Sequence, residues 1–396
     1  MATFNPRRFA RPECLKAVTP HRLLAFLNHF REYLDGRIRL PERAEDGIPY
    51  SKLATVLMSP DESAPERMVD ALYLIHEMAA PDSMEILLKA AGTFGLDLSM
   101  DADASPADVA LQIWLLAPGL LERKHAESQV SRPRSFRYFC GTTGNGAGFS
   151  IPTTTIVRDL EIDLDSWFAE HKRGVGSKVF LFDDGVRLSM MIRHGMPVKR
   201  EGAMKDGQSS SVFYRPEKHD VLVYSRSMDE IGIHTGTKGE RELYLRKIGQ
   251  YFFGDPGHFP RVEKYRLDPL RDDGQAALVC TDVPGLERVT LLAISNAIGG
   301  DYKLVETSKA TDLFAAMEMA NRPLIPADAC PVRAVFEIQV ADSKTVRKIT
   351  LCPPNVAIYT RGEESPLVEE WLLKRGFIIS PRGYSHAHGD AVLAGP

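Results

Sequence analysis

The sequence predicts an α+β protein, with an N-terminal helical bundle followed by antiparallel sheet packed with helices. Apolar residues recur at helical spacing through residues 1–131, whereas β-branched and aromatic runs joined by turns dominate after residue 178. Strand runs joined by short turns, with a helix after each run, are typical of antiparallel sheets backed by helices. We divide the chain into a helical domain at 1–131, a Gly-rich linker at 132–152, α+β units at 153–260 and 261–380, and a flexible tail at 381–396.

Clear start signals precede the helices of the first region. Ser63 and Glu66 have the spacing of a capping box, in which each side chain bonds the backbone N–H of the other residue. Ser105 followed by Pro106 predicts another helix start, because proline is favoured at the first helical position. The helix after Ser105 is apolar on most sides, which predicts a central position in the bundle. The expected helices cover about residues 20–34, 66–79, 82–91 and 106–116.

A Gly-rich stretch at 141–148 lies at the boundary between the two regions. Its alternating glycines invite comparison with nucleotide-binding loops, where backbone N–H groups at a helix N-terminus cradle phosphate. The residues that follow, 149–156, are β-branched and interrupted by Pro152, and the lysine of a Walker motif is missing. We therefore interpret this stretch as an inter-domain loop.

Paired strand-like runs characterise the second region. Residues 179–182 and 186–192 flank a turn that contains Gly185, and this arrangement predicts a hairpin. Residues 205–211 have the composition of an exposed flexible loop. Further hairpins are expected at 221–234, at 277–281 with 289–294, and at 332–340 with 346–351, and helices at 239–253, 311–319 and 365–376.

A weak internal repeat accompanies this pattern. A helical run precedes a hairpin at 164–192, and the same order recurs at 312–351. Duplication of a helix-and-sheet unit is one interpretation, and chance recurrence of a common motif is the other. A duplicated unit would produce a pseudo-symmetric curved sheet, which is a suitable shape for a rod-like partner.

The composition excludes several classes of protein. Of 396 residues, 44% are hydrophobic and 26% charged, which is typical of a globular chain and not of a disordered or collagen-like one. With 49 Lys+Arg against 53 Asp+Glu, the net charge is −4. The chain therefore lacks the overall excess of positive charge that drives strong non-specific binding to nucleic acid. The cysteines occur singly, no signal run is visible, and no apolar stretch reaches the roughly 20 residues of a membrane helix. We expect a cytoplasmic protein that does not bind membranes.

Asp328 and Glu337 imitate part of a restriction-type nuclease site. Such sites need two acids for Mg²⁺ and a lysine that orients the attacking water. Here Gln339 stands where the lysine would be. The favoured interpretation is an amphipathic strand with one solvated face, which includes Glu337.

Two histidines define a second candidate site. His219, Asp220 and His234 flank one predicted hairpin, so strand pairing could bring them together as a metal or acid–base cluster. Histidines at strand ends are more often surface or second-layer residues, and we favour that interpretation.

Basic and aromatic residues are interleaved in two windows, 193–218 and 238–266. Each window has more Lys and Arg than Asp and Glu, although the chain as a whole is weakly acidic. Positive charge mixed with aromatic rings suits phosphate contact and base stacking, while charged helix faces and core aromatics give the same mixture. The candidate nucleic-acid contacts are Arg193, Lys199, Arg200, Lys205, Arg215, Arg246, Lys247 and Lys264.

These patterns favour a non-enzymatic binding or accessory component. We expect it to contact DNA, RNA or a partner protein through the central α+β region, and no cofactor is predicted. The alternative left open is a metal-dependent nuclease or hydrolase, centred on Asp328 and Glu337 or on the group of His219, Asp220 and His234. Membership of a bacterial multi-protein system, such as an antiviral defence system, is a hypothesis that no residue supports.

Overall fold

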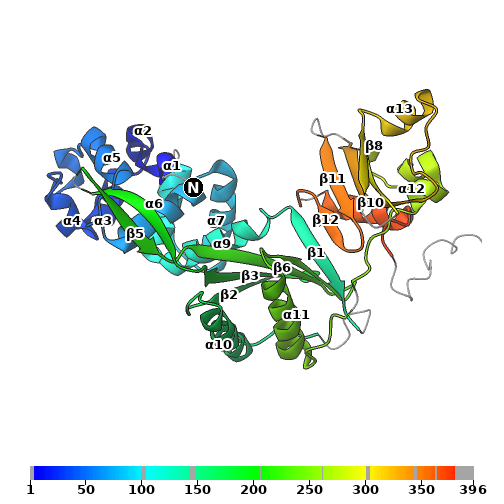
Figure 1. The fold of residues 1–396 in the computed structure, drawn as a ribbon. Helices are drawn as coiled ribbons and strands as arrows, with labels where there is room; N and C mark the ends of the chain where they lie inside the picture. The colour runs from blue at the N-terminus through cyan, green and yellow to red at the C-terminus, as the bar shows by residue number, and fades with distance from the viewer. Residues whose placement is uncertain are drawn as a thin grey trace, which may run out of the picture. The chain divides into compact units, whose positions relative to one another are not determined.

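The computed structural model of the chain describes residues 4–99, 104–142, 149–205, 207–260, 262–299, 304–341, 346–361 and 364–379. The chain forms two compact units, Met1–Ser128 and Gln129–Pro396 (Figure 1). Most of the Gly-rich stretch, residues 143–148, and the tail expected at 381–396 lie outside the described residues. The α+β class predicted from the sequence is confirmed, with the helical unit at the N-terminus.

Unit 1 is built from helices around a single apolar core. Its described helices are α1 (Arg7–Ala10), α2 (Pro12–Lys16), α3 (Pro20–Asn28), α4 (Arg31–Asp35), η1 (Ala44–Asp46), α5 (Tyr50–Met58), α6 (Glu66–Met78), α7 (Pro81–Thr93), α8 (Pro106–Leu116) and α9, which begins at Pro118 and continues to Val130. Among the described residues of the whole chain, no helix combines the length and apolarity needed to cross a membrane.

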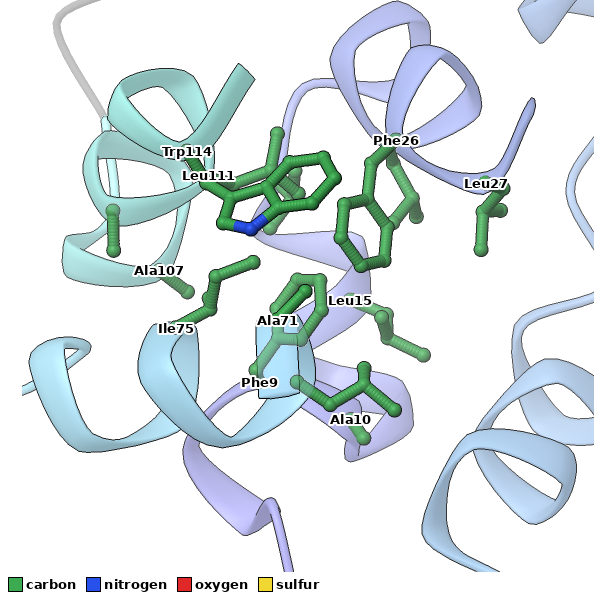
Figure 2. Packing of buried hydrophobic residues seen from close by; sticks show 14 of the residues in the cluster. Phe9, Ala10, Leu15, Phe26, Leu27, Ala71, Ile75, Ala107, Leu111 and Trp114 are labelled. Atoms are coloured by element: carbon green, nitrogen blue, oxygen red, sulfur yellow. The ribbon is translucent and has the colours of Figure 1, made fainter. Parts of the chain in front are cut away.

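Helix α8 lies at the centre of this core, as its apolar pattern predicts. Every residue from Ala107 to Trp114 is buried. The indole of Trp114 packs edge-on against Phe26 of α3, with ring centroids 5.0 Å apart (Figure 2). Burial of apolar surface of this kind is the main force that holds a helical unit together.

Of the two helix N-caps predicted from the sequence, Ser105 is confirmed and Ser63 is wrong. Ser105 caps α8, because its hydroxyl accepts a hydrogen bond from the backbone N–H of Asp108. The capping box predicted at Ser63 is wrong: Pro65 precedes α6 directly, and the Ser63 hydroxyl donates to Asp61 instead. A nearby carboxylate has therefore replaced the helix terminus as the partner of Ser63.

Unit 2 contains a sheet of ten described strands, and neighbouring strands are antiparallel throughout. In spatial order they are β2 (Lys178–Asp183), β3 (Arg187–Gly195), β6 (Glu217–Ser225), β7 (Glu230–His234), β1 (Ser135–Cys140), β12 (Val356–Ile358), β11 (Arg347–Cys352), β10 (Ala329–Val340), β8 (Leu286–Ile298) and β9 (Val305–Lys309). The hairpins predicted at 179–192, 221–234 and 332–351 are confirmed as β2–β3, β6–β7 and β10–β11.

The same order of elements occurs on both sides of the central strand β1. On one side, α10 (Thr154–Glu170) precedes β2, β3, β6 and β7, and α11 (Lys238–Phe253) follows. On the other side, α12 (Pro269–Asp272) precedes β8, β10, β11 and β12, and α14 (Ser365–Lys374) follows. Additional strands or helices are inserted within each half: β4 (Lys199–Lys205) and β5 (Gln208–Tyr214) in the first, and η2 (Gly274–Leu278), β9 and α13 (Leu313–Met319) in the second.

The helices of the two halves cover opposite faces of the sheet. Phe139 of β1 belongs to the core beneath α10 and α11. Phe136 pairs with Ala357, which shares a sheet face with Phe336, and Phe336 packs against Trp371 of α14. Because side chains alternate along a strand, Phe136 and Phe139 face opposite sides of the sheet. Strand β1 therefore contributes to both cores, although the sequence reading placed it in a linker.

Two further expectations are wrong. Residues 277–281 were expected to form a strand, but Ala277 lies in the short helix η2, and β8 pairs with β10 and β9 instead. Residues 205–211 were expected to be a loop, but they belong mostly to a two-stranded ribbon. Both segments are short and have no clear period of polar and apolar residues. Their secondary structure was therefore predicted from local composition alone, which was misleading.

Candidate functional site

A two-stranded ribbon of unit 2 is largely exposed to solvent. It consists of β4 (Lys199–Lys205) and β5 (Gln208–Tyr214), which pair with each other in a sheet of their own. We call these two strands the arm. The arm is inserted between β3 and β6 and extends from their ends (Figure 1). Gly207 supplies the positive φ of 75° that the tight turn between the strands requires.

The pairing of the arm separates its side chains into two faces. Arg200 lies opposite Phe213, and Met204 lies opposite Ser209, so these residues share one face. No acidic residue lies on this face among the described residues. The other face includes Lys199 and Lys205, and its only described acid, Glu201, hydrogen-bonds Tyr214.

Both faces of the arm are open to solvent. Met204 is 73% exposed and Phe213 is 66% exposed, which is unusual for large apolar side chains. Lys199, Arg200 and Lys205 are all exposed. In the part of the chain that the structure describes, no carboxylate forms an ion pair with Lys199 or Arg200.

The base of the arm is held firmly. The Arg215 guanidinium, just after β5, donates to the backbone carbonyls of Lys172 and Met196. Gly195 leaves room for this side chain: an added Cβ there would lie 2.4 Å from a backbone oxygen and 2.5 Å from Arg215 Cδ. Gly174 makes a similar close approach to Arg215. The arm thus leaves the sheet from a fixed root.

Next to this root, five side chains form what we call the buried ion network: His194, Asp220, Glu240, Lys218 and Arg173. His194 Nε2 lies 3.0 Å from Asp220 Oδ2, and Lys218 Nζ lies 2.9 Å from Asp220 Oδ1. Lys218 Nζ also donates to both oxygens of Glu240 at 2.8 Å, and Arg173 pairs with Glu240. The network joins the ends of β3 and β6 to the first turn of α11 and to the residues after α10.

Both carboxyl groups of the network are held ionised. Burial raises the pKa of Glu240, but hydrogen bonds from Lys218 and Thr235 outweigh burial and lower the pKa to about 2. Burial also opposes the ionisation of Asp220, yet the hydrogen bond with His194 and the charge of Lys218 hold its pKa below the usual value. Tyr244 of α11 donates a further hydrogen bond to Asp220 at 2.7 Å.

His194, Asp220 and Glu240 resemble the ligand set of a metal site. Their donor atoms lie within 4.8 Å of one another, and all three residues are buried. However, Lys218 Nζ already contacts both carboxylates at 2.8–2.9 Å, and Arg173 binds Glu240. These two cations balance the two negative charges, so the network does not fit a metal ion. Its geometry fits a structural role at the root of the arm.

The metal-site candidates from the sequence are not brought together. Asp328 is exposed just before β10, and Glu337 lies nine positions further along that extended strand, which places them roughly 30 Å apart. His219 and His234 share one face of the sheet, whereas Asp220 faces the opposite side. His219 pairs with Glu217, and His234 Nδ1 contacts the backbone oxygen of Ser135.

The basic candidates fall into different environments. Lys199, Arg200 and Lys205 lie on the arm, and Arg246 is exposed on α11. The others have partners: Arg193 with Glu217, Arg215 with backbone carbonyls, Lys247 with Asp163, and Lys264 with Glu230. Lys264 is only 3% exposed, and its ammonium lies 3.7 Å from the centre of the Tyr138 ring. We therefore leave Lys264 out of any proposed surface.

Sequence reasoning missed the partners of the buried acids. His194 follows Met190 and Ile192 on the buried face of β3, and this alternation was the available signal for an inward-facing histidine. A second buried pair joins Asp229 Oδ1 to His258 Nε2 at 3.0 Å, and Tyr224 donates to the same carboxylate. Asp229 and His258 are 29 residues apart in sequence, so no local spacing could pair them.

Comparison with known proteins gives no further information on this site, since no protein-family model and no curated protein sequence matches the chain.

Proposed function

We propose that this protein is a non-enzymatic nucleic-acid-binding component and that the arm is its principal contact. The observation that carries this proposal is the exposure of a basic, partly apolar ribbon whose Lys199 and Arg200 have no carboxylate partner among the described residues. Unpaired cations in this setting are available to phosphate groups, which dominate the affinity of nucleic-acid binding.

The shape of the arm supports nucleic acid over a partner protein. A two-stranded antiparallel ribbon fits the major groove of duplex DNA. On the acid-free face, Arg200 can read a base edge or bind phosphate, while Met204 and Phe213 can stack against bases or insert between them. The fixed root at Arg215 presents this face in one orientation, which lowers the entropy lost on binding.

The test compares two triple variants by fluorescence anisotropy with labelled duplex DNA, single-stranded DNA and RNA. The arm variant is Lys199→Gln, Arg200→Gln and Lys205→Gln. The control variant removes three exposed lysines of unit 1: Lys16→Gln, Lys52→Gln and Lys89→Gln. Both variants change the net charge equally. We expect the arm variant to lose on the order of 10²-fold in affinity at about 0.1 M salt, and the control to lose much less.

Equal losses in the two variants would contradict the proposal, because they would show a general charge effect. Wild-type protein that binds none of the three probes at low salt would also contradict it. If a purified partner protein, and not nucleic acid, binds the wild type and is lost in the arm variant, then the arm is a protein-docking element instead.

A further inference from the structure

Two arginines lie on one face of the sheet, away from the arm. Cys352 of β11 pairs with Val356 of β12, and Val356 pairs with Arg137 of β1. Ala334 of β10 pairs with Leu351, so one position further along each strand Arg333 lies beside Cys352 and continues this row. Directly paired residues point to the same face, so both arginines lie on the same side as Cys352. This face is the one that α14 leaves uncovered in the second half of the sheet.

Both arginines act on the Cys352 thiol, and the positive charge of each lowers its pKa against the larger, opposing effect of burial. Arg333 hydrogen-bonds the Cys352 thiol, and the charge of Arg137 acts on the same thiol from the other side. Strands are about 4.8 Å apart, so the two Cα atoms are separated by roughly 14 Å, and the long side chains close part of this gap. Arg137 is further oriented by Asn355, whose side-chain oxygen accepts from Nη1 at 3.2 Å.

A third arginine comes from the helix that covers the first half. Arg241 lies in the first turn of α11, where its backbone N–H donates to Thr237. Burial lowers the pKa of the Arg241 guanidinium, and the nearby charge of Arg137 lowers it further. The two positive groups therefore repel each other across the border between α11 and the open sheet face.

No carboxylate compensates these charges directly. Among the described residues, Arg137, Arg241 and Arg333 form no ion pair with an acidic side chain, and the nearest acidic influence is that of Glu242 on Arg241. Like charges held together without a counter-charge destabilise the unliganded fold, and such arrangements are concentrated at sites that bind a ligand of opposite charge.

We propose that Arg137, Arg241 and Arg333 form a binding site for a phosphate group. Guanidinium groups bind phosphate through paired, parallel hydrogen bonds, and three of them arriving from different directions can surround a phosphate group. The phosphate belongs either to a small phosphorylated molecule or to a nucleic-acid backbone. The three arginines lie on β1, β10 and α11 and not on the arm. The phosphate-site proposal therefore does not depend on the proposed function of the arm.

The test measures thermal unfolding of the full chain in phosphate and in chloride at equal ionic strength. Wild type should gain about 3–6 °C in Tm at ten times the dissociation constant of phosphate. Arg241→Gln and Arg333→Gln should each lose this gain. In chloride, Arg241→Gln should have a Tm equal to or above that of wild type, because the substitution removes a repulsion. Arg137 is not substituted, since its hydrogen bond to Asn355 also supports the fold.

Arg322→Gln is the matched control, because Arg322 is an exposed arginine of the same unit outside the row. It should keep the full phosphate gain. If either cluster variant also keeps the gain, or if the control loses it, the proposal is overturned. A fall in the chloride Tm of Arg241→Gln would likewise overturn it, because that result would mean that Arg241 stabilises the empty fold.

Cys352 provides a second, local readout. Its thiol lies between Arg137 and Arg333, so a bound phosphate should cover it and slow its alkylation several-fold, measured by peptide mass spectrometry. Exposed Cys330 serves as the internal reference. Protection by inorganic phosphate or a nucleoside triphosphate indicates a small-molecule site, and protection by an oligonucleotide alone indicates a nucleic-acid site. Absence of protection by all three probes would contradict the proposal.

Discussion

Replacing Glu240 by glutamine should strongly destabilise unit 2. Glu240 is fully buried and accepts hydrogen bonds from Lys218 to both oxygens at 2.8 Å and from the Thr235 hydroxyl at 2.7 Å. Its pKa falls from 4.5 to about 2 in the folded chain, which corresponds to about 3 kcal/mol. Loss of one partner from a buried ion pair costs about 3–5 kcal/mol, so both arguments agree. For a unit of this size the Tm should fall by about 6–12 °C.

The assay is thermal unfolding followed by circular dichroism at neutral pH. Glu242→Gln is the matched control on the same helix, because the Glu242 side chain is 61% exposed and its ion pair with Lys238 lies at the surface. Its Tm should stay within about 1 °C of wild type. Equal Tm changes in the two variants would refute the assignment of Glu240 to a stabilising network.

The pH dependence provides an independent check of the same prediction. A carboxyl group whose pKa is lowered by folding stabilises the fold above its unfolded pKa, here about 4.5, and this stabilisation is lost as the pH falls toward about 2. The difference in stability between wild type and Glu240→Gln should therefore be constant above about pH 5 and shrink below it. A difference that grows on acidification would contradict the sign of this argument.

Further predictions concern close packing, metal binding and a second buried pair. Gly195→Ala should lower the Tm of unit 2, because the new Cβ would lie 2.4 Å from a backbone oxygen, whereas Gly202→Ala on the arm meets nothing within 4 Å and should be neutral. Equal effects would show that the root is not tightly packed. EDTA and added Zn²⁺ should both leave the Tm unchanged, since Lys218 and Arg173 already neutralise the two buried carboxylates; stabilisation by Zn²⁺ that is lost on chelation would refute this. Lys264→Met should cost about 3–5 kcal/mol by leaving the buried Glu230 charge unpaired, and Lys264→Met with Glu230→Gln should recover part of the loss in urea unfolding. A double variant less stable than the single one would contradict that account.

The sequence predicted elements with a strong period and missed those without one. Helix α8 and the hairpin β2–β3 have long apolar patterns that a 3.6- or two-residue period explains. Strand β1 was missed because it stands alone in sequence, and its partners β7 and β12 lie about 90 and 220 residues away. Strand pairing between residues so far apart produces no recognisable pattern within a short stretch of sequence.

The composition of the sequence indicated which segments carry the candidate basic residues, but it did not indicate which of their side chains are exposed or which residues they contact. The basic windows did contain the arm, yet they also contained Lys264, whose charge is buried against Glu230. Asp220 was recognised as a chemically interesting residue, but its partner is His194 on the neighbouring strand and not His234. Which face a strand residue occupies depends on register, and register is set by pairing that the sequence does not state.

The salt dependence of binding tests the central claim most directly. Plots of log K against log salt concentration for wild type and the arm variant should differ in slope, because three phosphate contacts of Lys199, Arg200 and Lys205 contribute about 2.7 to the slope on duplex DNA and about 2.1 on single strands. The control variant of unit 1 should keep the wild-type slope. An arm variant with the wild-type slope, on every probe that binds, would show that the arm does not contact phosphate and would contradict the proposed function.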